Sequence, residues 1–63
     1  MLRVLITLQR MSTGSVLSEI AMPDSLVSSD NTYDADAWVC DNFPGFVITR
    51  IQVIVLSSNH GQH

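Results

Sequence analysis

The chain has 63 residues, of which 46% are hydrophobic and 14% are charged, and its formal net charge is −3. This length allows one domain, which hides only roughly 60% of the surface of its unfolded chain, and the apolar content is too high for a disordered protein. Three basic residues against six acids argue against direct binding of DNA or RNA, because that binding depends on neutralising phosphates.

The chain has one cysteine, Cys40, so an intrachain disulfide is excluded. A domain with so thin a core is therefore expected to gain stability by self-association. The lone thiol favours a reducing, cytoplasmic location. The apolar run Val4–Leu8 is too short for a signal peptide, and no segment approaches the roughly 20 apolar residues of a membrane span. We expect a cytoplasmic protein with no membrane partner.

The first two segments predict a β-hairpin. Residues 2–9 alternate apolar and polar side chains with one exception at Leu5, which is typical of a strand. The small residues 12–15, including Gly14, predict a turn. A second strand is predicted over residues 16–22, and Pro23 ends it because proline has no amide proton for a ladder. The residues expected to share one side of this strand are Val16, Ile20 and Met22.

Residues 26–31 are rich in serine and aspartate and predict a loop, and residues 32–42 then predict a helix. Asn31 or Thr32 can cap this helix, acids occupy its first turn, and Pro44-Gly45 ends it. A period of 3.6 residues defines an apolar face that contains Tyr33, Ala35, Ala37, Val39, Cys40 and Phe43. The opposite face contains Asp34, Trp38, Asp41 and Asn42.

The longest apolar segment, residues 46–56, is rich in β-branched side chains and predicts a third strand. Strict alternation places five of its residues toward the core: Val47, Thr49, Ile51, Val53 and Val55. The other face is apolar at both ends and polar at Arg50 and Gln52.

These elements predict a small α+β domain of ββαβ order, with a three-stranded antiparallel sheet in the order 2-1-3 and one helix packed on one face. The preference for right-handed crossovers supports this order. We expect a single domain over residues 1–56 and a flexible polar tail over residues 57–63. The face without a helix would then be free for self-association through Leu5, Ile48, Ile54 and Leu56.

Catalytic, metal-binding and cofactor-binding residues are not indicated. Cys40 with His60 or His63 has the residue types of a thiol nucleophile and base, and the histidines have the spacing of some metal ligands. However, Cys40 is expected on the core face and the histidines in the tail. No glycine lies in a nucleotide-binding motif. We therefore expect no catalytic group, no metal and no cofactor.

The acids suggest a protein-binding surface, since five of the six lie between residues 24 and 41. Trp38 has Asp34 four residues before it and Asp41 three residues after it, which places an aromatic ring between two carboxylates on a helix. Tryptophan is a frequent anchor in interfaces and carboxylates select basic partners. The predicted partner-binding residues are Asp30, Asp34, Asp36, Trp38 and Asp41. In the alternative interpretation Trp38 covers the sheet and the aspartates are caps and solubilising charges.

We thus expect a small acidic protein-binding module that occupies a basic protein surface. One form is an inhibitor whose aspartates cover a basic site of a nucleic-acid-handling or host protein. The alternative is a homo-oligomeric structural or assembly subunit without a heterologous partner, and an enzyme ranks third. Exposure of Trp38 in an assembled oligomer would favour the first hypothesis, and its burial in the self-interface the second.

Overall fold

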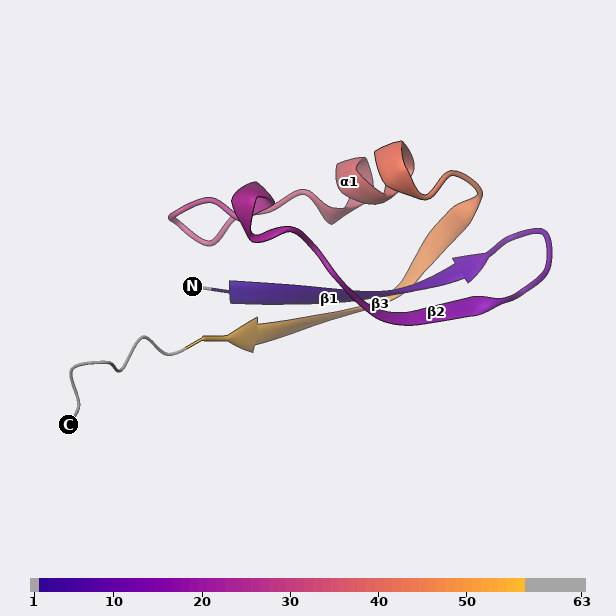
Figure 1. Ribbon diagram of the computed structural model, residues 1–63, viewed down its shortest axis with the longest axis horizontal. Helices are drawn as coiled ribbons and strands as arrows, with labels where there is room; N and C mark the ends of the chain where they lie inside the picture. The colour runs from indigo at the N-terminus through magenta and orange to yellow at the C-terminus, as the bar shows by residue number, and fades with distance from the viewer. Residues whose placement is uncertain (1, 57–63) are drawn as a thin grey trace.

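The computed structural model describes residues 2–56, and the predicted tail, residues 57–63, lies outside this range. The elements follow the order β1 (Leu2–Arg10), β2 (Val16–Ala21), a short 3-10 helix η1 (Asp24–Leu26), α1 (Ala35–Asn42) and β3 (Phe46–Val55) (Figure 1). Neither helix of this part of the chain is long and apolar enough to cross a membrane.

The predicted sheet is confirmed. The three strands have the order β2-β1-β3, and β1 pairs antiparallel with both neighbours. α1 and η1 lie on one side of this sheet (Figure 1). The hairpin turn is closed by Gly14, whose φ of 76° is in the left-handed region that glycine adopts readily. The fold is therefore a small α+β domain with one α-helix packed against a three-stranded sheet.

The core is centred on the middle strand. Val4, Ile6 and Leu8 of β1 are fully buried, in agreement with the alternation of the sequence. The remaining buried residues of this core are Met22, Ala35 and Val39. α1 thus covers the face of β1 on which the three branched side chains stand, and the backbone amide of Met22 donates to the carbonyl of Val4, which holds the end of the hairpin against the core.

The helix begins later than the sequence suggested. Its N-cap is Asp34, whose Oδ1 accepts a hydrogen bond from the amide of Ala37 at 3.0 Å. Thr32 cannot take this role because it belongs to a tight loop, in which its amide and hydroxyl bond to side chains of Ser28 and Asp30. Asn31 in this loop has a φ of 65°, which no helix allows.

A β-bulge changes the face assignment of β3. Thr7 of β1 is opposite Arg50, but the next residue, Leu8, is opposite Ile48, so Thr49 is an extra residue in β3. The alternation predicted for residues 46–56 is therefore correct only after the bulge. Before it, Phe46 and Ile48 pack against the core and Val47 is exposed, the reverse of the expected arrangement.

A second irregularity corrects the face assignment of β2. Ile6 is opposite Ile20 and Leu8 is opposite Leu17, so two residues of β2 lie opposite Thr7. One of them, Glu19, has a φ of 55°. Ile20 packs against the core, but Val16, which precedes the irregularity, is exposed, so the two residues do not share one side as predicted.

The two methionines outside the N-terminus provide a matched test of this core. Met22 has an exposed fraction of 3% and Met11 one of 67%. Met22→Ala should lower the free energy of unfolding by about 2–5 kcal/mol, because it removes buried side-chain atoms and leaves a cavity. Met11→Ala should change it by less than about 0.5 kcal/mol. Urea unfolding monitored by circular dichroism measures both; similar losses would contradict this core.

Candidate protein-binding surfaces

Trp38 lies in a groove of about 270 Å³ on one side of α1. The side chain is half-buried and packs partly against the core. The other residues that line this groove are Leu26, Asp34, Ala37, Asp41 and Asn42. The structure therefore brings Trp38, Asp34 and Asp41 together as their helical spacing predicted, while the tryptophan also covers the sheet in part, as the alternative interpretation held.

The ring of Trp38 is held by neighbouring residues. It makes an edge-to-face contact with Phe43, with 5.4 Å between the ring centroids, which is a favourable geometry for aromatic pairs. The side-chain amide of Asn42 donates to the carbonyl of Trp38 at 2.8 Å, which satisfies an acceptor near the helix end. The contact with Phe43 thus supports the ring, and the Asn42 hydrogen bond supports the helix backbone at Trp38.

The rim of this groove is acidic. Asp34 and Asp41 are both exposed and lie on the first and last turns of α1. Oδ1 of Asp34 accepts the capping hydrogen bond from Ala37. A carboxylate has about four acceptor sites, so Asp34 can accept further donors from outside the chain. The groove is an apolar recess with two carboxylates at its border, and it has no basic residue among those that line it.

The remaining predicted partner-binding acids lie elsewhere. Asp36 borders a different groove on the β3 side of α1. Asp30 belongs to the loop before the helix, where the hydroxyls of Ser28 and Thr32 both donate to its Oδ1. These hydrogen bonds, that from Ser28 first, lower the pKa of the Asp30 carboxyl below its ordinary value. Asp30 therefore organises its own loop, and the structure does not place it beside Trp38.

The groove on the β3 side of α1 has a volume of about 560 Å³ and is mostly apolar. Its aromatic wall is formed by Phe43 and Phe46, whose ring centroids are 6.1 Å apart. The guanidinium carbon of Arg10 lies 4.6 Å from the centroid of the Phe46 ring, a cation–π contact that fixes this ring. The other lining residues are Asp36, Val39, Cys40, Pro44, Gly45, Val47 and Ile48.

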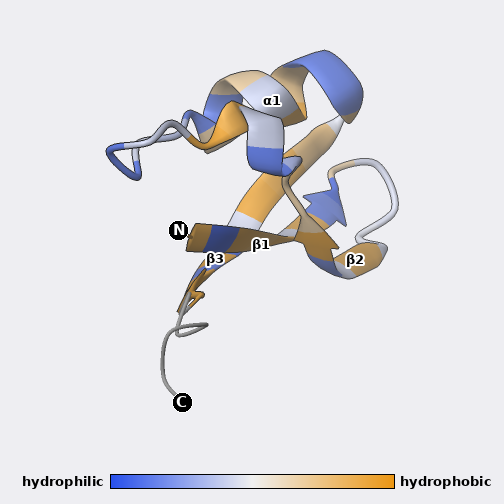
Figure 2. Cartoon of the chain, turned by 60° about the vertical axis from the view of Figure 1, so that its left-hand side comes forward, coloured by the Kyte–Doolittle hydropathy of each residue, from blue (hydrophilic) through white to orange (hydrophobic). Residues whose placement is uncertain are grey.

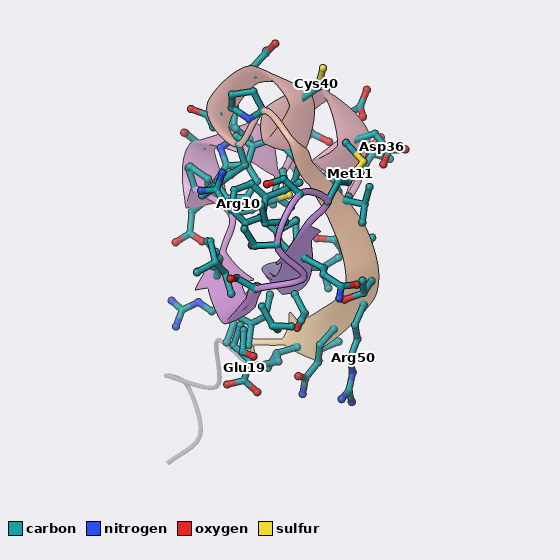
Figure 3. The ribbon with its side chains drawn as sticks, turned by 90° about the vertical axis from the view of Figure 1, so that its right-hand side faces the viewer. Arg10, Met11, Glu19, Asp36, Cys40 and Arg50 are labelled. Carbon is teal, nitrogen blue, oxygen red and sulfur yellow. The ribbon has the colours of Figure 1, made fainter. Side chains whose placement is uncertain are left out.

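Cys40 is exposed at the border of this groove, which corrects its predicted place on the core face (Figure 3). The core face of α1 is narrower than the sequence suggested: Ala35 and Val39 are buried, and Ala37 is exposed with Cys40. The reason is the short helix, which contacts the sheet along one narrow stripe.

The four residues predicted for self-association do not share one face. Leu5 lies on the face away from α1 with Ile54, because Arg3 and Leu5, two residues apart in β1, share that face and are opposite Ile54 and Gln52. Ile48 packs against the core beneath α1 instead, and Leu56 follows the end of β3. The open face also holds Arg50 and Glu19, which point away from α1 in Figure 3. The open face of the sheet is therefore more polar than the sequence suggested.

Residues 2–56 contain no group of three or more His, Cys, Asp or Glu side chains that could hold a metal ion. His60 and His63, considered above as partners of Cys40, lie outside the described residues.

Sequence reasoning missed Leu26 as a wall of the Trp38 groove. Leu26 ends the 3-10 helix η1, whereas the sequence predicted that it begins a loop over residues 26–31. The available signal was the apolar pair Leu26-Val27 within a run of serine and aspartate, three residues after Pro23. Pro44 and Phe46 were also missed as lining residues of the β3-side groove. Pro44 was interpreted only as the end of the helix, and Phe46 only as the start of a strand.

Comparisons with protein-family models, with curated proteins and with solved structures find no match to this chain. The function must therefore be inferred from the geometry of these surfaces.

The exposure of Cys40 predicts fast labelling. A maleimide or aromatic disulfide reagent should modify this thiol in the native protein at a rate close to that of the urea-unfolded chain. Cys40→Ser should change the free energy of unfolding by less than about 0.5 kcal/mol, because no buried apolar volume is lost. If the labelling rate of the native protein were instead reduced in proportion to the folding equilibrium constant, the Cys40 thiol would be buried.

The lowered pKa of Asp30 predicts a pH effect with a defined sign. Because the folded pKa lies below the unfolded one, the stabilisation is present above the ordinary aspartate pKa of about 3.9 and is lost as the pH falls through the folded value. Ser28→Ala should move the Asp30 pKa upward, measured by carbon-detected NMR titration. An Asp30 pKa that stays unchanged in Ser28→Ala would contradict this role of the Ser28 hydroxyl.

Proposed function

We propose that this chain is a small protein-binding module whose Trp38 groove receives a basic side chain of a partner protein. The observation that carries the proposal is the combination in one groove of a held tryptophan ring with the exposed carboxylates of Asp34 and Asp41. An arginine or lysine can place its apolar stem on the ring and its charge at the carboxylates, as amphipathic side chains do elsewhere.

The charge distribution supports a partner with a basic surface. All six acids lie between residues 19 and 41, and no arginine or lysine occurs between Arg10 and Arg50. The side of the molecule formed by η1, the loop and α1 is therefore negative throughout, which steers a basic partner toward the groove and raises its rate of association. One form of this function is inhibition, in which the carboxylates cover a basic surface that otherwise binds phosphates.

The two kinds of contact should contribute differently. Exposed charge pairs are worth about 0.2–1 kcal/mol each and are screened by salt. Contact with the tryptophan ring excludes water and depends little on salt. The acids would therefore set the rate at which a partner arrives, and Trp38 the time for which it stays.

Trp38 is the only tryptophan of the chain, so its fluorescence reports directly on this groove. We expect a blocked tetra-arginine peptide to change the emission saturably and with an affinity that falls as salt is raised. A tetra-glutamate peptide should have no effect. Asp34→Asn with Asp41→Asn should weaken binding by about 0.4–2 kcal/mol, the sum of two exposed pairs. Asparagine still caps the helix, so α1 is preserved.

The matched control is Glu19→Gln with Asp24→Asn, which removes the same charge away from the groove. Equal loss of binding in the two double variants would mean that net charge alone attracts the peptide. That result, or a fluorescence signal that does not respond to tetra-arginine at all, would contradict the proposed groove.

A further inference from the structure

We infer that the free edge of β3 pairs antiparallel with β3 of a second copy of this chain, about a two-fold axis at Gln52, to form a continuous six-stranded sheet. Within the described residues β3 pairs with β1 alone, so one side of this ten-residue strand presents backbone donors and acceptors without a partner strand. Such an edge is a template for pairing unless the chain protects it.

The two edges of the sheet differ in protection. β2 is short, is interrupted at Glu19 with its positive φ, and is followed by Pro23, all of which hinder strand addition. β3 has no proline, one charge at Arg50 and a bulge at Thr49. After Arg50 its sequence is Ile-Gln-Val-Ile-Val without a charge. The second half of β3 is therefore the edge segment that is least protected against pairing with another strand.

The apolar side chains at this edge are incompletely covered. Ile51, Val53 and Val55 are opposite Ile6, Val4 and Leu2, so they share the face on which α1 lies. Nevertheless their exposed fractions are 43%, 43% and 75%. α1 lies over the other end of the strand, where its groove is lined by Phe46 and Ile48. Figure 2 shows hydrophobic colour on both sides of a hydrophilic break in β3.

This arrangement is self-complementary, which is why a second copy is the occupant. With the axis at Gln52, Ile51 and Val53 of one β3 lie opposite Val53 and Ile51 of the other, so the uncovered second halves of the two strands lie side by side. A two-fold axis perpendicular to the sheet repeats this contact twice, as an isologous dimer requires. Each uncovered apolar ridge would then be covered in part by the same ridge of the other copy.

The charge of Arg50 selects the register. Directly opposite residues share a face, so a two-fold axis must pass beside one residue and its own copy. An axis at Arg50 would place two like charges in contact, which is destabilising. An axis at Gln52 lets the two amides bond, sets Ile51 opposite Val53, and separates the two Arg50 residues by about 14 Å along the strand, at about 3.4 Å per residue. That distance exceeds the screening length of about 10 Å at 0.1 M salt.

The first test is the oligomeric state of the full chain, measured by sedimentation equilibrium over a concentration series. The unmodified chain should be a dimer, and Val53→Lys should raise the dimer dissociation constant by about tenfold or more, which corresponds to about 1.4 kcal/mol or more. Leu5→Lys places the same charge on the open face, and Val16→Lys places it at the β2 edge; neither should change the dissociation constant.

A monomeric unmodified chain, or dissociation by Leu5→Lys but not by Val53→Lys, would overturn the inference. The first result would fit an edge that accepts a strand of another protein, and the second would fit stacking of open faces.

The second test is independent of the lysine variants and examines the register. In the background Cys40→Ser, Gln52→Cys should form a disulfide-linked dimer on mild oxidation, because residues directly opposite in an antiparallel pair have Cα atoms about 4.5–5.5 Å apart, within the range of a disulfide. Ile54→Cys in the same background lies two residues from the axis and should remain unlinked. Equal linking of both variants, or none of Gln52→Cys, would overturn the proposed pairing.

Discussion

Burial of the central strand is the constraint on which the rest of this structure depends. Val4, Ile6 and Leu8 are fully buried in a chain of 63 residues, and every other core residue is positioned by contact with them. β1 forms both ladders of the sheet, so its alternation sets the face on which α1 must lie. A domain of this size buries little of its surface. Its one α-helix has eight residues, so it covers only part of that face. The part that the helix leaves uncovered includes Ile51, Val53 and Val55 of β3.

The two β-bulges determine which apolar residues are covered. An extra residue at Thr49 turns Phe46 and Ile48 toward α1 and leaves Val47 exposed, whereas the residues after it keep the phase of β1. The extra residue in β2 near Glu19 exposes Val16 in the same way. In β3 the bulge therefore brings apolar side chains from both halves of the strand onto the face of α1. α1 covers the first half, which forms the aromatic groove, and leaves the second half as an exposed ridge on the same face.

The two candidate surfaces lie on different sides of α1 and have different chemistry. The Trp38 groove combines an aromatic wall with an acidic rim, which suits a basic side chain of another protein. The edge of β3 is apolar and rich in unpaired backbone, which suits a strand. Their lining residues do not overlap, so a dimer formed through β3 would keep two acidic grooves free. Binding of a basic partner and self-association are therefore compatible, and pairing would present the grooves in two copies.

The sequence by itself determined the three strands, the single helix, the strand order and the grouping of Asp34, Trp38 and Asp41, because these follow from local periodicity, turn residues and helical spacing. Only the tertiary structure decided the exposure of Cys40, the phase of the first half of β3 and the start of the helix. A bulge shifts a strand by one residue without any signal that alternation alone can reveal, and one shifted residue reverses the face of all that precede it. The helix start was set by a contact that periodicity does not encode, since the hydroxyl of Thr32 bonds within its loop to Asp30 and leaves the cap to Asp34.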